Sequence, residues 1–341
     1  MTNCLGKDTF LYFKLLLTIT LFFRCNFRRI YKQNNMKTNQ RNVLGVVALL
    51  AFFIVGCAQT DTKEDKTTEK TETTPPARIA APQPSPSSKV EQTVGLTKVT
   101  LEYSRPAMRG RKIFGDLVPF DKVWRTGANA NTKISFDTDI TIGETTVKAG
   151  SYAIFTKPGE KNWEIMFYSA TDNWGTPQKW DKTKVVATTS VTPETMPMAI
   201  ESFTMTFDDL TNNSAVLGML WENTYVGLPF TVPTDAAVMA SIEEVMKGSP
   251  NDRAYYDAAV YYKSEGKDIN QALTWIDKAV EMSKEQPKFY YLRQQSLIHA
   301  KAGKTATAIA AAKQSLELAK KAGNADYVKM NTDSLKDWGA L

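Results

Sequence analysis

The sequence predicts a mainly β domain, of the sandwich or jelly-roll class, followed by an all-α C-terminal module. Two observations support this order. Between residues 94 and 233, short runs rich in Val, Ile, Thr, Phe and Tyr are separated by turn residues, and no helical periodicity intervenes. After Pro233 the apolar residues recur with a period of about 3.6 instead. A chain of 341 residues has room for both parts.

Alternation within the runs predicts strands that bury one face. In the clearest run, Phe203, Met205 and Phe207 alternate with serine and threonine residues, as expected for a half-buried strand. Turn signals such as Ala149-Gly150 and Pro158-Gly159 separate the runs. About eight such strands without helices between them favour antiparallel sheets packed face to face. We therefore expect an antiparallel β-sandwich domain over residues 94–233.

An apolar run before a cysteine predicts an export signal. From Met36, two basic residues precede the apolar run 43–55, whose length is typical of a signal peptide rather than a membrane span. The residues Ile54-Val55-Gly56-Cys57 resemble the bacterial lipobox, which implies cleavage before Cys57 and acylation of its sulfur. We expect residues 36–57 to be a lipoprotein signal peptide. The exported protein is then anchored by lipid in the cell envelope, at the outer membrane.

Residues 1–35 have two interpretations. The apolar stretch 10–23 is interrupted by Lys14 and is short for a membrane span. The simpler interpretation is that translation starts at Met36 and that residues 1–35 are an over-translated leader. The alternative is a signal anchor followed by the basic residues Arg24, Arg28 and Arg29.

Residues 58–93 are rich in Thr, Lys, Glu and Pro and contain little apolar surface to bury. Such a composition predicts a disordered tether between the lipid anchor and the folded part of the chain.

Composition excludes several classes of function for the part after Cys57. Residues 1–57 hold eight of the 42 Lys and Arg residues and one of the 36 acidic residues, so 34 basic and 35 acidic residues remain. The resulting net charge of −1 gives no basic footprint for nucleic acid. All three cysteines lie in residues 1–57, and His299 is the single histidine. We therefore expect no nucleic-acid partner, no metal site and no cofactor.

The segment from Tyr103 to Ile134 interrupts the strand pattern and predicts a site. It is dense in Arg, Gly, Asn and aromatic residues, and loops of this length in compact domains are usually functional or disordered. Its apolar content favours order. The guanidinium groups of this segment, Arg109 among them, are placed to converge on an anionic group, and tryptophans offer flat apolar walls. The candidate ligand-binding residues are Arg105, Arg111, Trp124, Arg125, Thr126, Asn129, Trp221 and Glu222.

A structural role for the same residues stays open. Arginines in a long loop often donate to backbone carbonyls and fix the loop, and tryptophans of a sandwich usually belong to the core. Paired carboxylates for hydrolysis have candidates in Asp116, Asp121 and Glu222, but no spacing singles out a pair. We therefore assign no catalytic residue.

Several short motifs of this domain resemble one family. They are Tyr103-Ser104-Arg105-Pro106, Gly110-Arg111, Phe114-Gly115, Leu117-Val118-Pro119, Val123-Trp124-Arg125-Thr126-Gly127-Ala128-Asn129, Ala149-Gly150-Ser151-Tyr152, Trp174-Gly175 and Leu220-Trp221-Glu222. In this order they resemble a bacterial family of uncharacterised domains, domain of unknown function 2911. The resemblance implies a fold class and a secreted or lipid-anchored address, but no activity.

The C-terminal part predicts a repeated pair of helices. A bridging helix is expected over residues 234–248, closed by Gly248 and followed by a cap at Ser249. Gly266 and Gly303, 37 residues apart, each end a helix. Small residues recur at a spacing of 36, with Ala272 matching Ala308 and Ala279 matching Ser315.

This pattern resembles two tetratricopeptide-like repeats with a capping helix over residues 249–341. The resemblance implies a protein or peptide partner at the repeats, or else a structural appendage. His299 falls at a packing position, so we expect an interface histidine.

These observations favour a non-enzymatic function. We expect an envelope lipoprotein that acts as a ligand-binding or protein-interaction module. The alternative is a hydrolase of envelope carbohydrate or peptide, using carboxylates and arginines of the β domain.

Overall fold

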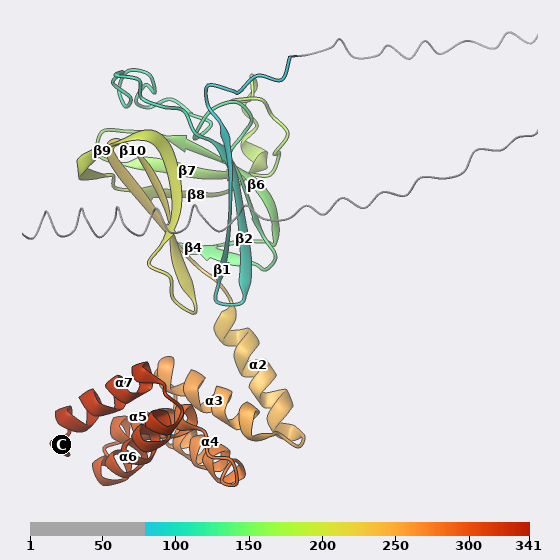
Figure 1. The fold of residues 1–341 in the computed structure, drawn as a ribbon. Coiled ribbons are helices and arrows are strands. Elements are labelled where there is room, and N and C mark those ends of the chain that lie inside the picture. Colours follow the sequence, from blue (N-terminus) through green and yellow to red (C-terminus); the bar gives the residue numbers. More distant parts are fainter. Residues whose placement is uncertain (1–78) are drawn as a thin grey trace, which may run out of the picture. The chain divides into compact units, whose positions relative to one another are not determined.

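The computed structural model describes residues 79–341. The predicted leader (1–35), the signal peptide (36–57) with Cys57, and residues 58–78 of the tether lie outside the described residues. The described chain contains two antiparallel sheets followed by six C-terminal helices (Figure 1). The predicted fold class, a mainly β domain followed by an all-α module, is therefore confirmed.

The first sheet has six strands in the order β1-β2-β3-β6-β7-β8, each antiparallel to its neighbours. Its strands are β1 (Ser87–Val94), β2 (Thr97–Ser104), β3 (Lys133–Phe136), β6 (Gly150–Lys157), β7 (Trp163–Tyr168) and β8 (Val185–Val191). A short 3-10 helix (Lys182–Lys184) leads into β8.

The second sheet has four strands in the order β5-β4-β10-β9. Its strands are β4 (Ile140–Ile142), β5 (Thr145–Val147), β9 (Glu194–Asp208) and β10 (Ser214–Thr231). The long β9–β10 hairpin changes register on both sides of Glu222, which is the mark of β-bulges. This irregularity turns Glu222 out of the regular alternation.

The core of the β domain is shared by both sheets. Phe203 and Met205 of β9 are 1% and 2% exposed, whereas Ser202 and Thr204 between them are only partly buried, as the alternation predicts. Side chains from every strand of the two sheets join one apolar cluster. This single core fixes the platform on which the segment between β2 and β3 lies.

The expected tether (58–93) is corrected at its C-terminal end. Strand β1 begins at Ser87 and pairs with β2 along its whole length, from Ser87 opposite Ser104 to Val94 opposite Thr97. Val94 is fully buried and Val90 packs against the core, whereas Glu91 and Thr93 on the other face are exposed. Pairing with β2 therefore makes a strand of a segment whose composition predicts none.

The helices are α2 (Thr234–Lys247), α3 (Asp252–Ser264), α4 (Ile269–Met282), α5 (Phe289–Lys301), α6 (Thr305–Lys321) and α7 (Ala325–Asp337) (Figure 1). The expected bridging helix is α2, with Gly248 at its C-terminal cap. The cap of the next helix is Asn251, whose side chain accepts a hydrogen bond from the Ala254 backbone amide at 2.9 Å; the expectation for Ser249 was wrong by two residues.

Small residues line the seams between the helices as the repeat pattern predicts. Ala272, Ala279, Ala308 and Ser315 are all fully buried. Helix α5 contacts both α3 and α7. Helix α4 packs against α3 and α5, and helix α6 packs against α5 and α7. Helices α3, α5 and α7 therefore share one layer.

Candidate functional site

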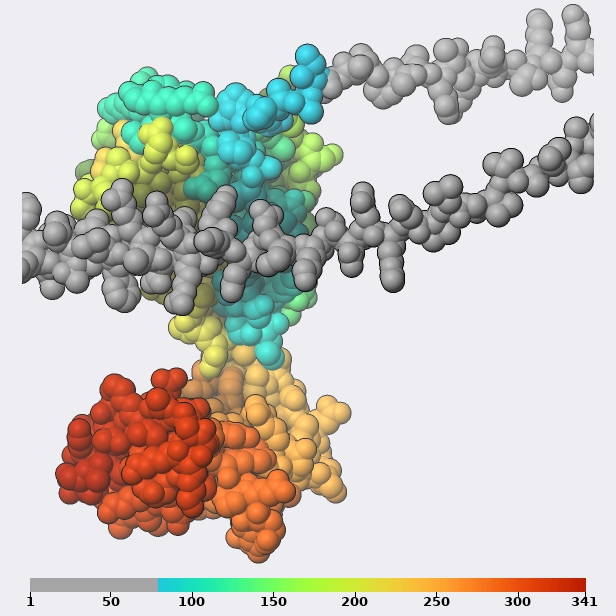
Figure 2. All heavy atoms as spheres, viewed as in Figure 1, coloured from blue at the N-terminus to red at the C-terminus, as the bar shows by residue number. Residues whose placement is uncertain are grey.

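A long loop, residues 105–132 between β2 and β3, carries most of the predicted site residues. It contains no regular strand but is fixed to both sheets. The Phe203 amide of β9 donates to the Pro106 carbonyl at 2.9 Å, and Trp124 exchanges two backbone hydrogen bonds with Thr156 of β6, at 2.7 and 2.9 Å. Figure 2 shows this segment, in turquoise, at the surface of the β domain beside the blue residues that precede β1.

The backbone of the long loop holds several residues in the left-handed region. Of the six described non-glycine residues with positive φ, four lie here, and the other two are Asp209 (φ 48°) and Glu222 of the β10 bulge (φ 53°). The four are Arg109 (φ 51°), Asp121 (φ 57°), Thr126 (φ 55°) and Asn129 (φ 58°). Thr126 is β-branched, so this conformation costs about 1–3 kcal/mol. Strain of this kind persists only where the surroundings fix the chain, and it is common at binding sites.

The surroundings of Thr126 fix it firmly. Its side chain is fully buried and donates to the Thr156 hydroxyl at 3.1 Å, while its carbonyl accepts a hydrogen bond from the Thr132 hydroxyl. The next residue, Gly127, has φ 136°, and a Cβ there would lie 3.0 Å from the Ser104 carbonyl oxygen. The loop therefore turns into the core at a position that requires glycine.

A cavity of about 400 Å³ opens between the long loop and β10. We call it the arginine pocket. Its size suits a small ligand. Three arginines line it, and no lining residue is acidic. The pocket is lined by Ser85, Pro106, Ala107, Arg109, Arg111, Leu117, Val118, Trp124, Arg125, Gly127, Ala128 and Trp221. This charge balance favours an anionic ligand.

Two of the three arginines are held by backbone carbonyls. Arg111 donates from Nε to the Met108 carbonyl at 2.8 Å and from Nη2 to the Ala107 carbonyl at 2.6 Å. Arg109 donates from Nη2 to the Pro84 carbonyl at 3.0 Å. These bonds fix the orientation of both guanidinium groups before any ligand binds.

Arg125 differs from the other two. Its side chain makes no hydrogen bond within residues 79–341, and its buried Nε atom has no acceptor there. Gly175 leaves room for it, since a Cβ at that position would lie 3.2 Å from Nη1. Nearby, the backbone amide of Asn131 donates to the Asn173 carbonyl at 3.3 Å, while the buried Asn173 Nδ2 also lacks an acceptor within the described residues. Buried donors without acceptors are uncommon in native proteins and call for a partner.

The two tryptophans form one wall of the arginine pocket. Trp124 and Trp221 stack with ring centroids 5.9 Å apart and planes 18° apart. Each indole N–H is satisfied within the protein, by the Gly127 carbonyl for Trp124 and the Glu201 carbonyl for Trp221, both at 3.2 Å. Trp221 is only 2% exposed and Trp124 is partly buried against the same core, so both belong mainly to the packing of the domain, and Trp124 has more surface left for a ligand.

The structure thus divides the eight candidate residues. Arg111, Trp124, Arg125 and Trp221 line the arginine pocket. The other four do not line it, and each holds part of the framework.

Arg105 donates to the Phe203 carbonyl (3.0 Å) and the Thr204 hydroxyl (2.6 Å) of β9. Asn129 donates to the Gln83 side chain at 2.9 Å and the Ser85 carbonyl at 3.0 Å.

Thr126 bonds to β6 as described above. The Glu222 carboxylate lies 3.4 and 3.5 Å from the amides of Ile113 and Phe114, against the backbone of the long loop.

Sequence reasoning missed several residues of the pocket. Ser85 comes from the segment before β1, where the sequence predicts a tether. Small and apolar lining residues such as Ala107 and Ala128 carry no chemical signal. Trp174, part of a family motif, is 74% exposed and does not line the pocket.

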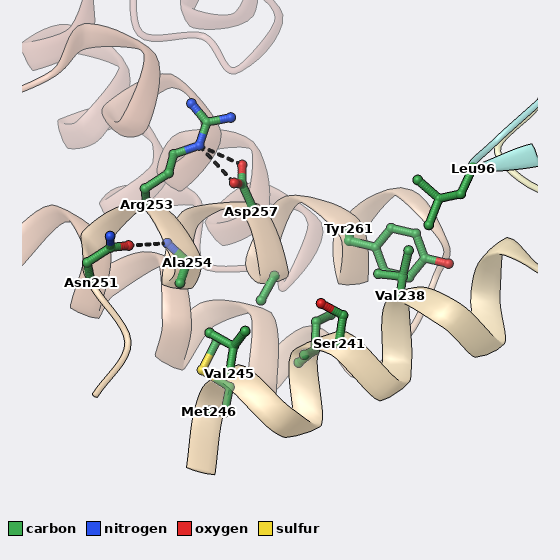
Figure 3. Close-up of a pocket in the computed structure, with 12 residues that line it drawn as sticks. Leu96, Val238, Ser241, Val245, Met246, Asn251, Arg253, Ala254, Asp257 and Tyr261 are labelled. Carbon is green, nitrogen blue, oxygen red and sulfur yellow. Dashed lines mark hydrogen bonds and ion pairs between the residues drawn. The ribbon is translucent and has the colours of Figure 1, made fainter. Parts of the chain in front are cut away.

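A second cavity of about 580 Å³ lies between α2 and α3 (Figure 3). Its walls are largely apolar, with Val238, Val245 and Met246 of α2 facing α3. Of the charged residues that line it, Arg253 and Asp257 pair with each other at 2.8 Å, so no net charge selects a ligand.

Two features are absent from residues 79–341. No cluster of three or more His, Cys, Asp or Glu side chains in this range is arranged to hold a metal ion. No helix of this range has the length and apolarity needed to cross a membrane. His299 is buried in the helical module and bonds through Nε2 to Asp277 at 2.8 Å.

Comparison with known proteins gives one match. Residues 85–230 match the family model described as "Protein of unknown function (DUF2911)". The match spans the two sheets and the whole arginine pocket, and it confirms the resemblance predicted from the motifs. No curated protein and no solved structure matches the chain. The family description prints no activity, so a function has to be inferred from the site itself.

Proposed function

We propose that this protein is a lipid-anchored envelope protein whose β domain binds a small anionic ligand in the arginine pocket. The observation that carries the proposal is Arg125, which lines a pocket together with two other arginines and no acidic residue, and whose side chain makes no hydrogen bond within residues 79–341. A carboxylate, phosphate or sulfate group would accept from Arg125 and Arg111 together. The accessible part of Trp124 would cover an apolar or sugar-like part of the same ligand.

Binding is favoured over hydrolysis by the positions of the carboxylates. Asp116 and Asp121 are exposed and Glu222 faces loop amides, and none of the three lines the arginine pocket. General acid–base hydrolysis requires such groups within hydrogen-bond reach of the reacting atoms. We therefore propose a binding protein without catalytic residues.

Attachment to the membrane is proposed from the sequence. The lipobox-like residues before Cys57 support acylation of that cysteine and anchoring at the outer membrane. Cys57→Ala is expected to move the protein from the membrane fraction to a soluble or unprocessed form. An unchanged requirement for detergent would contradict the anchor.

The helical module is proposed to be a protein-interaction module built from two tetratricopeptide-like repeats. Its support is the matching of α3–α4 with α5–α6. Gly266 and Gly303 follow equivalent helices with φ 65° and 75°, and buried small residues recur at the same offset. The layer formed by α3, α5 and α7 is the surface proposed for a partner.

The anion proposal is tested by thermal unfolding with named probes. Phosphate, sulfate and glucuronate are added to the full chain in detergent, with glucose as the uncharged control. At least one anion is expected to raise the melting temperature, because a ligand that binds only the native state stabilises it. Arg125→Gln should abolish this rise, whereas Lys122→Gln, an exposed residue of the same loop that does not line the pocket, should preserve it. An equal response of both variants would contradict the proposal.

A further inference from the structure

A second group of positive charges lies on the layer of α3, α5 and α7. Lys263 of α3 and Arg293 of α5 are both partly buried. Lys263 donates from Nζ to the Gln294 side-chain oxygen at 2.6 Å, and Arg293 donates from Nη1 to the Ser334 hydroxyl at 2.9 Å. Since Gln294 follows Arg293 and Ser334 belongs to α7, these bonds connect all three helices of the layer.

Every partner of these cations is neutral. Of the ion pairs within residues 79–341, none includes Lys263, Arg293 or the nearby Lys301, whose Nζ donates instead to the Lys263 carbonyl at 2.8 Å. Elsewhere in the module, ion pairs join different elements, as Lys288 at the start of α5 does with Asp252 of α3, and Lys267 with Asp235 of α2. The other unpaired cations of the described module, such as Lys278, Lys304 and Lys313, are exposed, so Lys263 and Arg293 are distinguished by combining partial burial with the lack of an ion pair.

The arrangement is electrostatically unfavourable in the unliganded protein. Burial lowers the pKa of Lys263 below its ordinary value, and the charges of Arg293 and Lys301 lower it further. Burial likewise lowers the pKa of Arg293. Both effects disfavour the charged forms, and a carboxylate placed between the side chains would reverse them.

Aromatic side chains lie on the same layer of helices. Tyr256 of α3 meets Tyr290 of α5 edge to face at 5.9 Å, and Tyr327 of α7 meets Phe289 of α5 at 4.8 Å. Burial raises the pKa of Tyr256 to about 12, so its hydroxyl remains a neutral donor at physiological pH. Tyr327 is close enough to Arg293 to act on its charge. Tyrosines on the same layer as cations suit a peptide, because they provide apolar area together with a hydroxyl donor.

We propose that Lys263, Arg293 and Gln294, with Tyr256 and Tyr327 on the same layer of helices, form a cationic patch that binds the side-chain carboxylates of an acidic segment of a partner protein. The charges sit on two neighbouring helices rather than in one closed pocket, which fits an extended chain carrying several carboxylates. This inference rests on the proposed interaction role of the helical module, and it is independent of the arginine pocket.

The test uses the full chain in detergent and two fluorescent peptides. One peptide contains alternating glutamate residues, and the other has glutamine at the same positions. The acidic peptide is expected to bind with an affinity that falls with added salt, and the glutamine peptide at least about tenfold more weakly, because hydrogen bonds between charged groups are stronger than those to a neutral amide.

Three variants locate the binding surface. Lys263→Met and Arg293→Met keep the apolar stem of each side chain and remove its charge. Each should weaken binding of the acidic peptide about tenfold or more. The control is Lys313→Met, which removes one exposed charge from α6 and should bind like the unsubstituted protein. Melting temperatures verify that all three variants are folded.

The outcomes separate this inference from the broader proposal. Equal binding of the two peptides would overturn the cationic patch but leave the interaction module in place. Selective binding of the acidic peptide that Lys263→Met and Lys313→Met weaken equally would also overturn the patch. No binding of either peptide would count against both the patch and the interaction role.

Discussion

The arginine pocket and the cationic patch both gather positive charge, but they hold it in different ways. In the arginine pocket, Arg109 and Arg111 donate to backbone carbonyls, and Arg109 itself has a positive φ angle. In the patch, Lys263 and Arg293 stand on regular helices and donate to neutral side chains. The acceptors in the arginine pocket are therefore backbone carbonyls, whereas the acceptors in the cationic patch are side chains that a ligand can replace.

This difference bears on selectivity. Carbonyls fixed by strained backbone hold a guanidinium in one orientation, so the arginine pocket is organised before its ligand arrives and should select one ligand shape. The patch can replace its hydrogen bonds to Gln294 and Ser334 by bonds to carboxylates in several positions. We expect it to select charge more than sequence.

The largest effect that separates the two regions concerns glycine. Gly127→Ala should lower the free energy of unfolding by about 1–3 kcal/mol for its backbone conformation, with a further loss from the contact with the Ser104 carbonyl. Gly266→Ala, at φ 65° with no atom within 4 Å of the new Cβ, should cost about 1 kcal/mol. Urea unfolding measures the free energy of unfolding of both variants. If Gly266→Ala destabilised the protein more than Gly127→Ala, the close approach of the Ser104 carbonyl to Gly127 would not be the reason for the loss at Gly127.

The next effect compares the stability contribution of an arginine that donates hydrogen bonds within the protein with that of one that donates none. Arg105→Met should cost about 1–2 kcal/mol, because it removes two hydrogen bonds to β9 and leaves the Phe203 carbonyl without its side-chain donor. Arg125→Met should cost less, since it removes a buried donor that has no acceptor within residues 79–341. The same unfolding measurement checks the pair. Equal losses would mean that Arg125 stabilises the fold and is no ligand donor.

The sequence predicted the fold class because the two-residue period of the strands and the 3.6-residue period of the helices are both local patterns. The alternation around Phe203 and Met205 and the glycines that end α3 and α5 are each visible within a short window. Strand β1 was missed because its pairing with β2, and not its own composition, makes it a strand. The same tertiary dependence hid Ser85 as a residue of the arginine pocket.

The two sites were unequally visible in the sequence. Arginines and tryptophans cluster within one segment of the long loop, so a site could be expected there. Which of these arginines donate to backbone carbonyls depends on the path of the loop backbone, including its positive φ angles. The residue types at Arg109 and Thr126 do not predict such angles. Lys263 and Arg293 lie on separate helices and look like ordinary solvated positions until the helices pack.

A smaller effect contrasts a paired cation with the unpaired ones of the patch. Lys288 holds the pKa of Asp252 below its ordinary value of 3.8. The pair therefore contributes stability above that value, and the contribution is lost as the pH falls through the lowered pKa. Asp252→Asn should cost about 0.5–1 kcal/mol at neutral pH, because the pair is partly exposed, and nothing well below pH 3.8. Unfolding as a function of pH checks this, and a loss that persists in acid would assign the effect to packing.

The smallest expected effect belongs to the patch itself. Lys263→Met should change the free energy of unfolding by less than about 0.5 kcal/mol. It removes the hydrogen bond to Gln294, but it also removes the cost of burying a charge beside Arg293 and Lys301. Lys288→Met, which breaks the Asp252 pair, is the matched control and should be the less stable of the two. A Lys263 variant as unstable as the Lys288 variant would mean that Lys263 stabilises the fold, and that its unpaired charge is not reserved for a partner.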